Sequence, residues 1–459
     1  MTRPARQLML ATVAVVSAAL AWVTLANRNL LRDARAPRAP AAMALWLAEH
    51  PADWRTAGSI AEQALDSSSA DRVALWRASY VHAKRLAPPR THSNTAFVRA
   101  GLFHWYELGA QDRARVLTAA APLMKERAFF EKMHVPLWEL THDMEWIRRS
   151  APDTLNARDA LATLAISRGL FPEYRALRED LRRTSYQTFL AERERADFAT
   201  LLNLLPDRPE RADEPLVRGI LAELDRRAFE AEQMNTRTET LIAYAVRHHL
   251  KPLEGIRPLL AAPTPLLRDV TRAQVALELG DLSLANQIEL AHALPGSAEW
   301  IPYDLDRARF AAKQHDAGTA ETYLRRASLG GATVPILAAA EEVAILLGND
   351  AGAYHRELVA RSAQPRVWTD ACTKDELCGN ATTDEYVTGG RVHLRLDPSQ
   401  SDETPAYVVV FIDDALAAET PVETTRTLSI AVDPGLHRIV LRLVNPRTRN
   451  GIQRRVRLS

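Results

Sequence analysis

The sequence lacks the short motifs that mark the commonest catalytic and cofactor sites. It contains no G-x-x-x-x-G-K-[ST] phosphate loop, no G-x-G-x-x-G, H-E-x-x-H or G-x-S-x-G motif, and no C-x-x-C pair. Glycine is scarce, with 18 among 459 residues, so long phosphate-binding loops are not expected. His248 and His249 are adjacent on a predicted helix, where their side chains diverge by about 100° and cannot share a metal without other ligands. We therefore predict a protein that is not an enzyme, with no catalytic residue, metal or cofactor.

The chain also lacks an excess of charge of either sign. Its 58 basic and 57 acidic side chains almost cancel, whereas nucleic-acid binders usually carry a strong basic excess, so no nucleic-acid partner is expected. Hydrophobic residues make up 47% and charged residues 25%, which excludes global disorder. A chain of 459 residues is too long for one compact core, so we expect several domains or an extended solenoid. The abundance of Ala and Arg hints at a GC-rich bacterial source.

Cysteine is nearly absent. The only two residues, Cys372 and Cys378, lie six positions apart in a polar segment. Such an isolated pair suits one disulfide in an oxidising compartment. Metal ligation needs further ligands, for which His393 is the only nearby candidate, and a pair of free surface thiols is the third interpretation. We predict the disulfide, provided that the chain is exported.

One long uncharged run stands at the N-terminus. Leu8–Ala26 covers 19 positions after two arginines, which at about 1.5 Å per residue approaches the thickness of a membrane's hydrocarbon core. The small residues at Ala19 and Ala21 suit a signal peptide cleaved after Ala21. The apolar run continues through Trp22–Ala26, which favours a retained anchor over residues 1–26. Residues 27–40, charged and interrupted by proline, are interpreted as a stalk beside the membrane.

The orientation of this segment is not fixed by the charges beside it. The arginines before the run are matched by those after it, so the positive-inside rule is almost balanced. A short basic leader followed by an apolar segment is typical of export signals, and the cysteine pair points the same way. We therefore expect a single-pass protein of the bacterial inner membrane with its body in the periplasm.

Residues 41–364 show an almost wholly helical pattern. Apolar residues recur at steps of three and four, prolines fall at regular breaks, and alternating strand patterns are absent. Many helices of about 12 to 16 residues joined by short turns predict stacked helical hairpins.

A repeat is visible inside this helical body. Gly280–Ala285, His315–Ala320 and Asn349–Tyr354 align at steps of 35 and 34 residues. In each, a residue able to turn ends one helix and the next residue, an Asp, begins another by accepting hydrogen bonds from free backbone N–H groups. This junction and its period resemble those of tetratricopeptide (TPR) repeats. The resemblance implies a helical-hairpin solenoid with a groove for a protein partner.

The most aromatic-rich stretch of the body lies around residues 128–140. If the solenoid has a groove, Phe129, Phe130 and Trp138 are its candidate anchors. Burial of these aromatic side chains between helices is the alternative, and it is the commoner fate of such residues.

The pattern changes at the C-terminus. Residues 365–390 are interpreted as a linker that carries the cysteine pair. Residues 391–459 then show short alternating or apolar runs separated by turn residues, as at Tyr407–Ile412 followed by Asp413 and Asp414. Their strand pattern predicts a small antiparallel β-sandwich and resembles the immunoglobulin-like or jelly-roll domains of exported proteins, some of which bind carbohydrate.

Arginines recur on the last two predicted strands. Arg438, Arg442, Arg455 and Arg457 point away from the expected core, and if the two strands pair they form one basic face. Such a face suits an anionic polysaccharide, lipid headgroups or an acidic partner. An ordinary solvated strand face with acidic neighbours is the alternative. The sequence as a whole predicts an envelope scaffold that binds a protein partner, or else a polysaccharide-binding accessory to surface-glycan synthesis or export.

Overall fold

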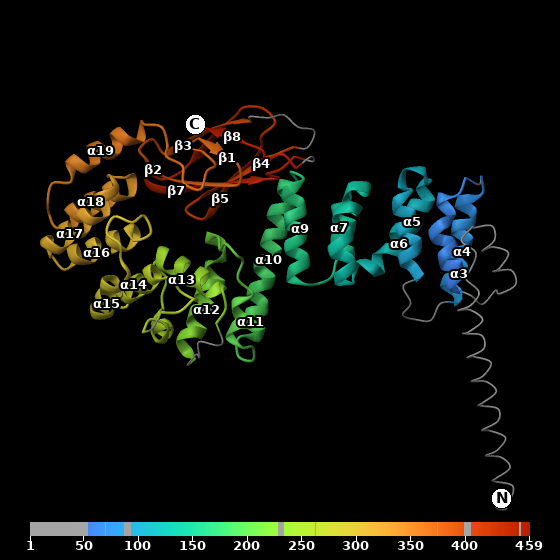
Figure 1. The fold of residues 1–459 in the computed structure, drawn as a ribbon, viewed down its shortest axis with the longest axis horizontal. Coiled ribbons are helices and arrows are strands. Elements are labelled where there is room, and N and C mark those ends of the chain that lie inside the picture. Colours follow the sequence, from blue (N-terminus) through green and yellow to red (C-terminus); the bar gives the residue numbers. More distant parts are fainter. Residues whose placement is uncertain are drawn as a thin grey trace, which may run out of the picture. The chain divides into compact units, whose positions relative to one another are not determined.

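The computed structural model describes residues 54–68, 70–86, 93–227, 234–261, 263–373, 375–398, 405–448 and 451–459. These residues are mainly helical as far as Ser362 and form an antiparallel β-domain after it, which confirms the predicted order (Figure 1). The expected membrane segment Leu8–Ala26 lies outside the described residues, among which no helix is long and apolar enough to cross a membrane. The chain divides into two compact units, residues 1–157 and 158–459.

The first unit is helical wherever it is described. Trp76 and Phe97 are fully buried, and their rings stack with centroids 4.2 Å apart. Nearby, Arg77 donates two hydrogen bonds, of 3.1 and 2.8 Å, to the buried carboxylate of Asp112, which joins α4 to α6. The helices are α3 (Trp54–Gln63), α4 (Arg72–Leu86), α5 (Ser93–Phe103), α6 (Ala110–Met124), α7 (Arg127–Thr141) and α8 (Met144–Ser150).

The second unit begins within α9 (Leu155–Ser167) and contains the remaining helices. Their apolar faces form one continuous core that runs from Phe189 on α10 to Tyr303 on α16. The helices are α10 (Phe171–Glu192), α11 (Phe198–Leu202), α12 (Glu214–Arg226), α13 (Arg237–Arg247), α14 (Asp269–Glu278), α15 (Leu282–His292), α16 (Ile301–Lys313), α17 (Ala317–Ala327), α18 (Val334–Leu346) and α19 (Gly352–Ser362).

The helix junctions bear out most of the predicted repeat. Gly280 (φ 73°) and His315 (φ 57°) adopt the left-handed conformation, and the following aspartates cap α15 and α17 by accepting backbone N–H bonds of 3.1 and 3.0 Å. At the third junction the prediction is wrong by one position. Gly348 (φ 73°), not Asn349, takes the left-handed conformation, because glycine has no Cβ to clash there.

The β-domain consists of two four-stranded antiparallel sheets around one apolar core. One sheet has the order β2-β7-β4-β5 and the other β1-β8-β3-β6. The predicted central strand at Tyr407–Ile412 is confirmed as β4, whereas β1 and β2 lie inside the segment expected to be a linker. The strands are β1 (Glu376–Leu377), β2 (Asn380–Val387), β3 (Arg391–Pro398), β4 (Tyr407–Ile412), β5 (Ala415–Pro421), β6 (Arg426–Ala431), β7 (Gly435–Val444) and β8 (Val456–Leu458).

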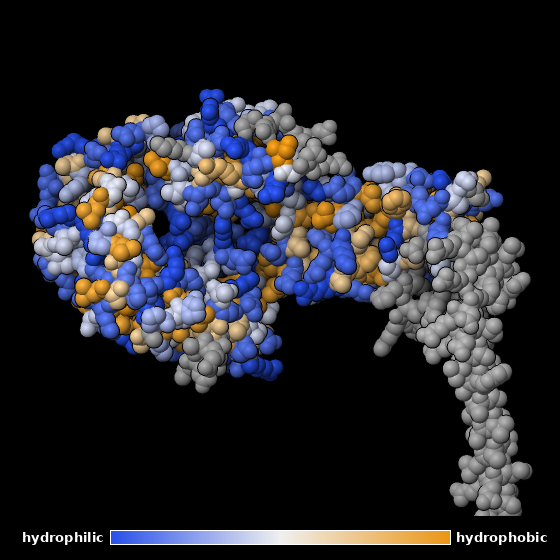
Figure 2. All heavy atoms as spheres, viewed as in Figure 1, coloured by the Kyte–Doolittle hydropathy of each residue, from blue (hydrophilic) through white to orange (hydrophobic). Residues whose placement is uncertain are grey.

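Within the second unit, the β-domain lies across the arc formed by its helices (Figure 1). The sheet that contains β7 faces the helices. Residues of this sheet and its loops contact helices that lie far earlier in the sequence. Asn445 Nδ2, for example, donates a 2.8 Å hydrogen bond to the carbonyl of Ser167, at the end of α9. The surface is hollowed between the arc and the β-domain, and strongly hydrophilic residues line the hollow (Figure 2). We call this hollow the recess.

Candidate functional site

The turn between β4 and β5 carries two aspartates toward the helices. Asp413 and Asp414 both have positive φ, 52° and 62°, as tight hairpin turns of this kind require. Asp413 fixes the turn, because its carboxylate accepts a 2.9 Å hydrogen bond from the backbone N–H of Arg438 and lies 2.7 Å from Nδ1 of His437. Although burial opposes it, the contact with Asp413 raises the pKa of His437. The turn thus presents Asp414 at its tip.

Asp414 joins the β-domain to the middle of the helical arc. Its carboxylate accepts a 2.8 Å hydrogen bond from Arg247 and a 2.9 Å bond from Nε2 of His248. Its backbone carbonyl accepts a 2.8 Å bond from the N–H of Arg211, in the short helix η3 (Arg211–Asp213). The Arg211 guanidinium lies 3.0 Å from Nδ1 of His248 and donates to it. The imidazole therefore carries its proton on Nε2, and this N–H donates the hydrogen bond to the Asp414 carboxylate.

These contacts keep the carboxylate of Asp414 ionised. Burial alone raises its pKa, but the hydrogen bond from His248 and the charge of Arg247 outweigh burial and lower the pKa to about 2. The side chain of Asp414 is 16% exposed and that of Arg247 is 43% exposed, so water screens their ion pair in part. Asp414 and its helical partners, Arg211, Arg247 and His248, are called the junction cluster below.

A second contact joins β4 and β5 to the start of α10. Gly169 (φ 70°) ends α9, and the Tyr407 ring lies so close that a Cβ at this glycine would come within 2.5 Å of it. Phe171 meets the same ring edge-on, with centroids 5.6 Å apart. Arg175 then donates a 2.9 Å hydrogen bond to Glu419 on β5. An aromatic contact and an ion pair together fix this end of the β-domain.

Buried charges position the helical side of the junction. Arg178 on α10 donates a 2.9 Å hydrogen bond to Glu210, and Arg182 also pairs with Glu210. The backbone N–H of Glu210 donates a 2.8 Å bond to Asp213, whose pKa is raised mainly by burial. Because Arg211 lies between these two acids in sequence, the network holds in place the backbone N–H that contacts Asp414.

The four predicted arginines do not form one face. The condition for one basic face, that the last two strands pair, is not met: β7 pairs with β2 and β4, whereas β8 pairs with β1 and β3 in the other sheet. The apolar residues of both strands enter the same core, but from opposite sides, so their arginines leave it in opposite directions. Arg438 and Arg442 lie on the sheet that faces the helices, and Arg455 and Arg457 lie on the other sheet.

The two pairs of arginines also differ in their partners. Arg455 contacts Glu376 at 3.0 Å, and Arg457 contacts Asp375 at 3.4 Å. In the described part of the chain, the guanidinium groups of Arg438 and Arg442 take part in no hydrogen bond or ion pair. The arginines beside and on β8 thus belong to an ordinary solvated strand face with acidic neighbours, which was the alternative interpretation. The arginines without an ion pair lie on β7.

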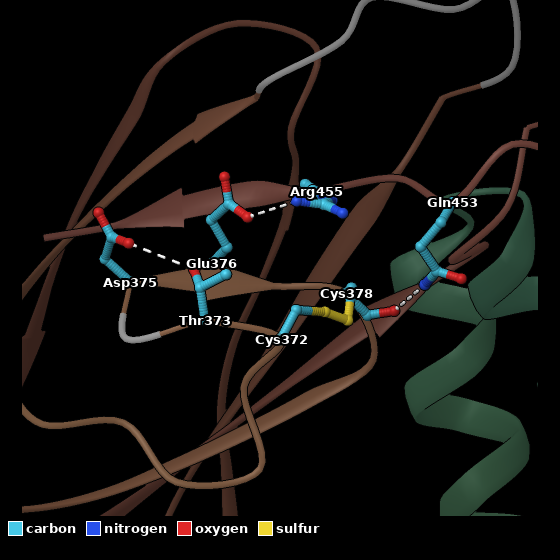
Figure 3. Close-up of a disulfide and its surroundings, with 7 residues drawn as sticks. All are labelled: Cys372, Thr373, Asp375, Glu376, Cys378, Gln453 and Arg455. Atoms are coloured by element: carbon cyan, nitrogen blue, oxygen red, sulfur yellow. Dashed lines mark hydrogen bonds and ion pairs between the residues drawn. A yellow bond between two sulfur atoms is a disulfide. The ribbon is translucent and has the colours of Figure 1, made fainter.

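The disulfide between Cys372 and Cys378 is confirmed. Its two Cα atoms lie 5.9 Å apart, and the bridge closes a short loop that contains β1 (Figure 3). Gln453 donates a 2.6 Å hydrogen bond to the carbonyl of Cys378, and Arg455 reaches Glu376 beside it (Figure 3). The bridge thus stabilises the sheet that faces away from the helices.

The predicted groove aromatics lie on α7, in the first unit. Phe130 is 1% exposed and stacks on His134 with centroids 4.8 Å apart, so it belongs to the core, as the alternative interpretation expected. Phe129 and Trp138 are half-buried, and the Trp138 ring lies 4.9 Å from that of His142. A role in binding stays a prediction for these two.

Two further polar features of the second unit lie apart from the junction cluster. A shallow hollow of about 580 Å³ includes His292 and Asp269, whose side chains lie 3.3 Å apart, and its one charged side chain without an ion pair among the described residues is the exposed Glu299. Between α15 and α17, Arg326 pairs with the buried carboxylates of Glu289 and Asp304, which closes that network internally. Among the described residues, no group of three or more His, Cys, Asp or Glu side chains is arranged to hold a metal ion.

Comparison with protein-family models, curated proteins and solved structures finds no match for this chain. The recess is thus identified by its own geometry: unpaired arginines on β7, opposite a helical arc that the junction cluster holds in place. Sequence reasoning singled out Arg438 and Arg442 but not their helical neighbours. Asp413 and Asp414 were predicted only as a turn, and nothing local in the sequence pairs Asp414 with residues 166 or more positions earlier.

Proposed function

We propose that this protein is a non-catalytic binding protein of the bacterial envelope that holds a segment of a protein partner in the recess of its second unit. The observation that carries the proposal is the recess itself, a hydrophilic hollow bounded by a helical repeat-like arc on one side and a β-sheet on the other (Figure 2). Concave surfaces of stacked helical hairpins, TPR-like arrays among them, are suited to extended protein segments.

The proposed location rests on other features. The disulfide suits an oxidising compartment, and the uncharged run Leu8–Ala26 suits a single membrane anchor with the body in the periplasm. A reporter fused to the C-terminus tests this. A reporter enzyme that is active only after export should be active in this fusion. Activity of a reporter that works only in the cytoplasm would contradict the proposed topology. Release of the body without detergent would indicate cleavage after Ala21.

The binding proposal is tested by photocrosslinking in cells. A photoreactive residue at Val440, on the helix-facing side of β7, should give an adduct with a partner protein. The same residue at Arg457, on the sheet that faces away, is the matched control and should give none. Adducts of equal yield at both positions, or none at Val440, contradict the proposal.

An anionic polysaccharide is the alternative ligand, favoured by the unpaired arginines of β7. Sugar sites usually add an aromatic face on which a ring can stack. On the helix-facing sheet, Tyr407 of β4 is 7% exposed and packs against Phe171, and the half-buried Tyr386 of β2 already meets the His355 ring edge-on. We therefore rank the protein partner first.

A further inference from the structure

The helix-facing side of β7 carries two arginines with one apolar residue between them. Ile439 and Leu441 enter the core of the β-domain, so the alternation of a strand places Arg438, Val440 and Arg442 on the opposite side. That side faces the helical arc (Figure 1). Four residues along a strand separate the two arginine Cα atoms by about 13 Å.

Arg438 has no ion pair of its own among the described residues. Burial, followed by repulsion from Arg247, lowers the pKa of Arg438, although the charges of Asp414, Asp384 and Asp370 oppose the change. Asp414 is already bound to Arg247 and His248. Asp384 is the register partner of Arg438 on β2, yet the two side chains form no ion pair in the described part of the chain. Three carboxylates therefore act on Arg438, but none of them forms an ion pair with its guanidinium in the described part of the chain.

Arg442 occupies the other end of this row. It is exposed, and its charge acts on Tyr174 of α10, whose pKa is raised chiefly by burial. Arg178 also acts on this tyrosine, but its charge is already balanced by Glu210. The guanidinium of Arg442, like that of Arg438, forms no hydrogen bond or ion pair among the residues the structure describes.

The spacing and the neighbours of the two arginines indicate the ligand. Side chains four residues apart in an extended peptide point the same way and are also about 13 Å apart, which matches the spacing on β7. Val440 lies between the arginines and pairs in register with Phe411 of β4, so the row offers an apolar contact between two cations. This alternation suits a peptide that carries acidic side chains at both ends and an apolar one between them.

We propose that the helix-facing side of β7 binds an extended acidic segment of a partner protein, with Arg438 and Arg442 each receiving one carboxylate. This inference rests on the proposed function and adds the chemistry of the segment that is bound. Arginine suits the role because its planar guanidinium can donate two parallel hydrogen bonds to a carboxylate.

The test is a titration of the full-length protein with a fluorescein-labelled peptide that contains Glu-Ala-Val-Ala-Glu, followed by anisotropy. The Arg438→Gln/Arg442→Gln variant should bind at least about tenfold more weakly, since each charged hydrogen bond lost weakens binding by about that factor. Arg455→Gln/Arg457→Gln is the matched control, with two arginines changed on the other sheet, and should bind like the wild type. Arg438→Lys/Arg442→Lys keeps the charges and should recover part of the affinity, which separates charge recognition from misfolding.

Three outcomes overturn the inference: no binding of the peptide, equal loss in both glutamine variants, or tighter binding of an oligogalacturonate of ten units than of the peptide. The last outcome assigns the row to an anionic polysaccharide. If the peptide fails but the Val440 photocrosslink to a partner persists, only this inference is lost. If both fail, the proposed function is lost as well.

Discussion

Replacing Asp414 with asparagine should loosen the β-domain from the helical arc. The side chain keeps its size, but the charge shared with Arg247 and His248 disappears. In the folded protein the pKa of Asp414 falls from 3.8 to about 2. At about 1.4 kcal/mol per pKa unit, this corresponds to about 2 kcal/mol. Because the folded pKa is lowered, this stabilisation is complete above about pH 4 and is lost as the pH falls toward 2.

Hydrogen–deuterium exchange followed by mass spectrometry measures the opening of this contact directly. A loss of about 2 kcal/mol raises the local opening constant roughly 30-fold, so amides of the β4–β5 hairpin and of the end of α13 should exchange faster at pH 7. Asp207→Asn is the control: Asp207 pairs with Arg237 at 3.0 Å but is 89% exposed, so little change is expected. Unchanged exchange in Asp414→Asn, or an equal change in the control, would refute this account of the junction.

Three further predictions concern stability. Gly169→Ala should destabilise the second unit by about 2–4 kcal/mol in thermal or urea unfolding, because it adds a clash with the tyrosine ring of β4 to the strain of positive φ. Gly280→Ala, with a similar φ but open space around it, should lose only about 1 kcal/mol. Arg326→Ala leaves the buried carboxylate of Asp304 without its partner and should lower the unfolding free energy by about 3–5 kcal/mol. Cys372→Ser opens a short loop and should reduce β-domain stability by about 2 kcal/mol, an effect that reductant should reproduce in the wild type.

The helical pattern was predictable because it depends on local chemistry. Left-handed turn residues at Gly280 and His315, each followed by a capping aspartate, are visible in the sequence and behave as expected. The error at the third junction has a local cause, since both Gly348 and Asn349 can adopt positive φ and glycine does so at lower energy. The disulfide was also predictable, because its two cysteines lie six positions apart and are the only ones in the sequence.

The arrangement around the recess was not predictable, because it depends on contacts between distant parts of the chain. Strand alternation correctly placed each arginine away from the core, but it does not say which sheet a strand joins. A single face of four arginines required the last two strands to pair, but they lie in different sheets, which separates Arg438 and Arg442 from the other two arginines. The junction cluster could not be foreseen either, since it joins a β-turn to helices through side chains 166 and 167 residues apart.

The recess exists because the β-domain lies across the helical arc (Figure 1). Cysteine crosslinking in the full-length protein checks this arrangement. With Arg175→Cys and Glu419→Cys, which replace two side chains joined by a 2.9 Å hydrogen bond, a short bismaleimide should form an intramolecular crosslink between α10 and β5. With Arg175→Cys and Arg457→Cys it should form none, because β8 lies on the other sheet. No crosslink in the first pair, or equal yields in both pairs, would contradict this placement of the β-domain.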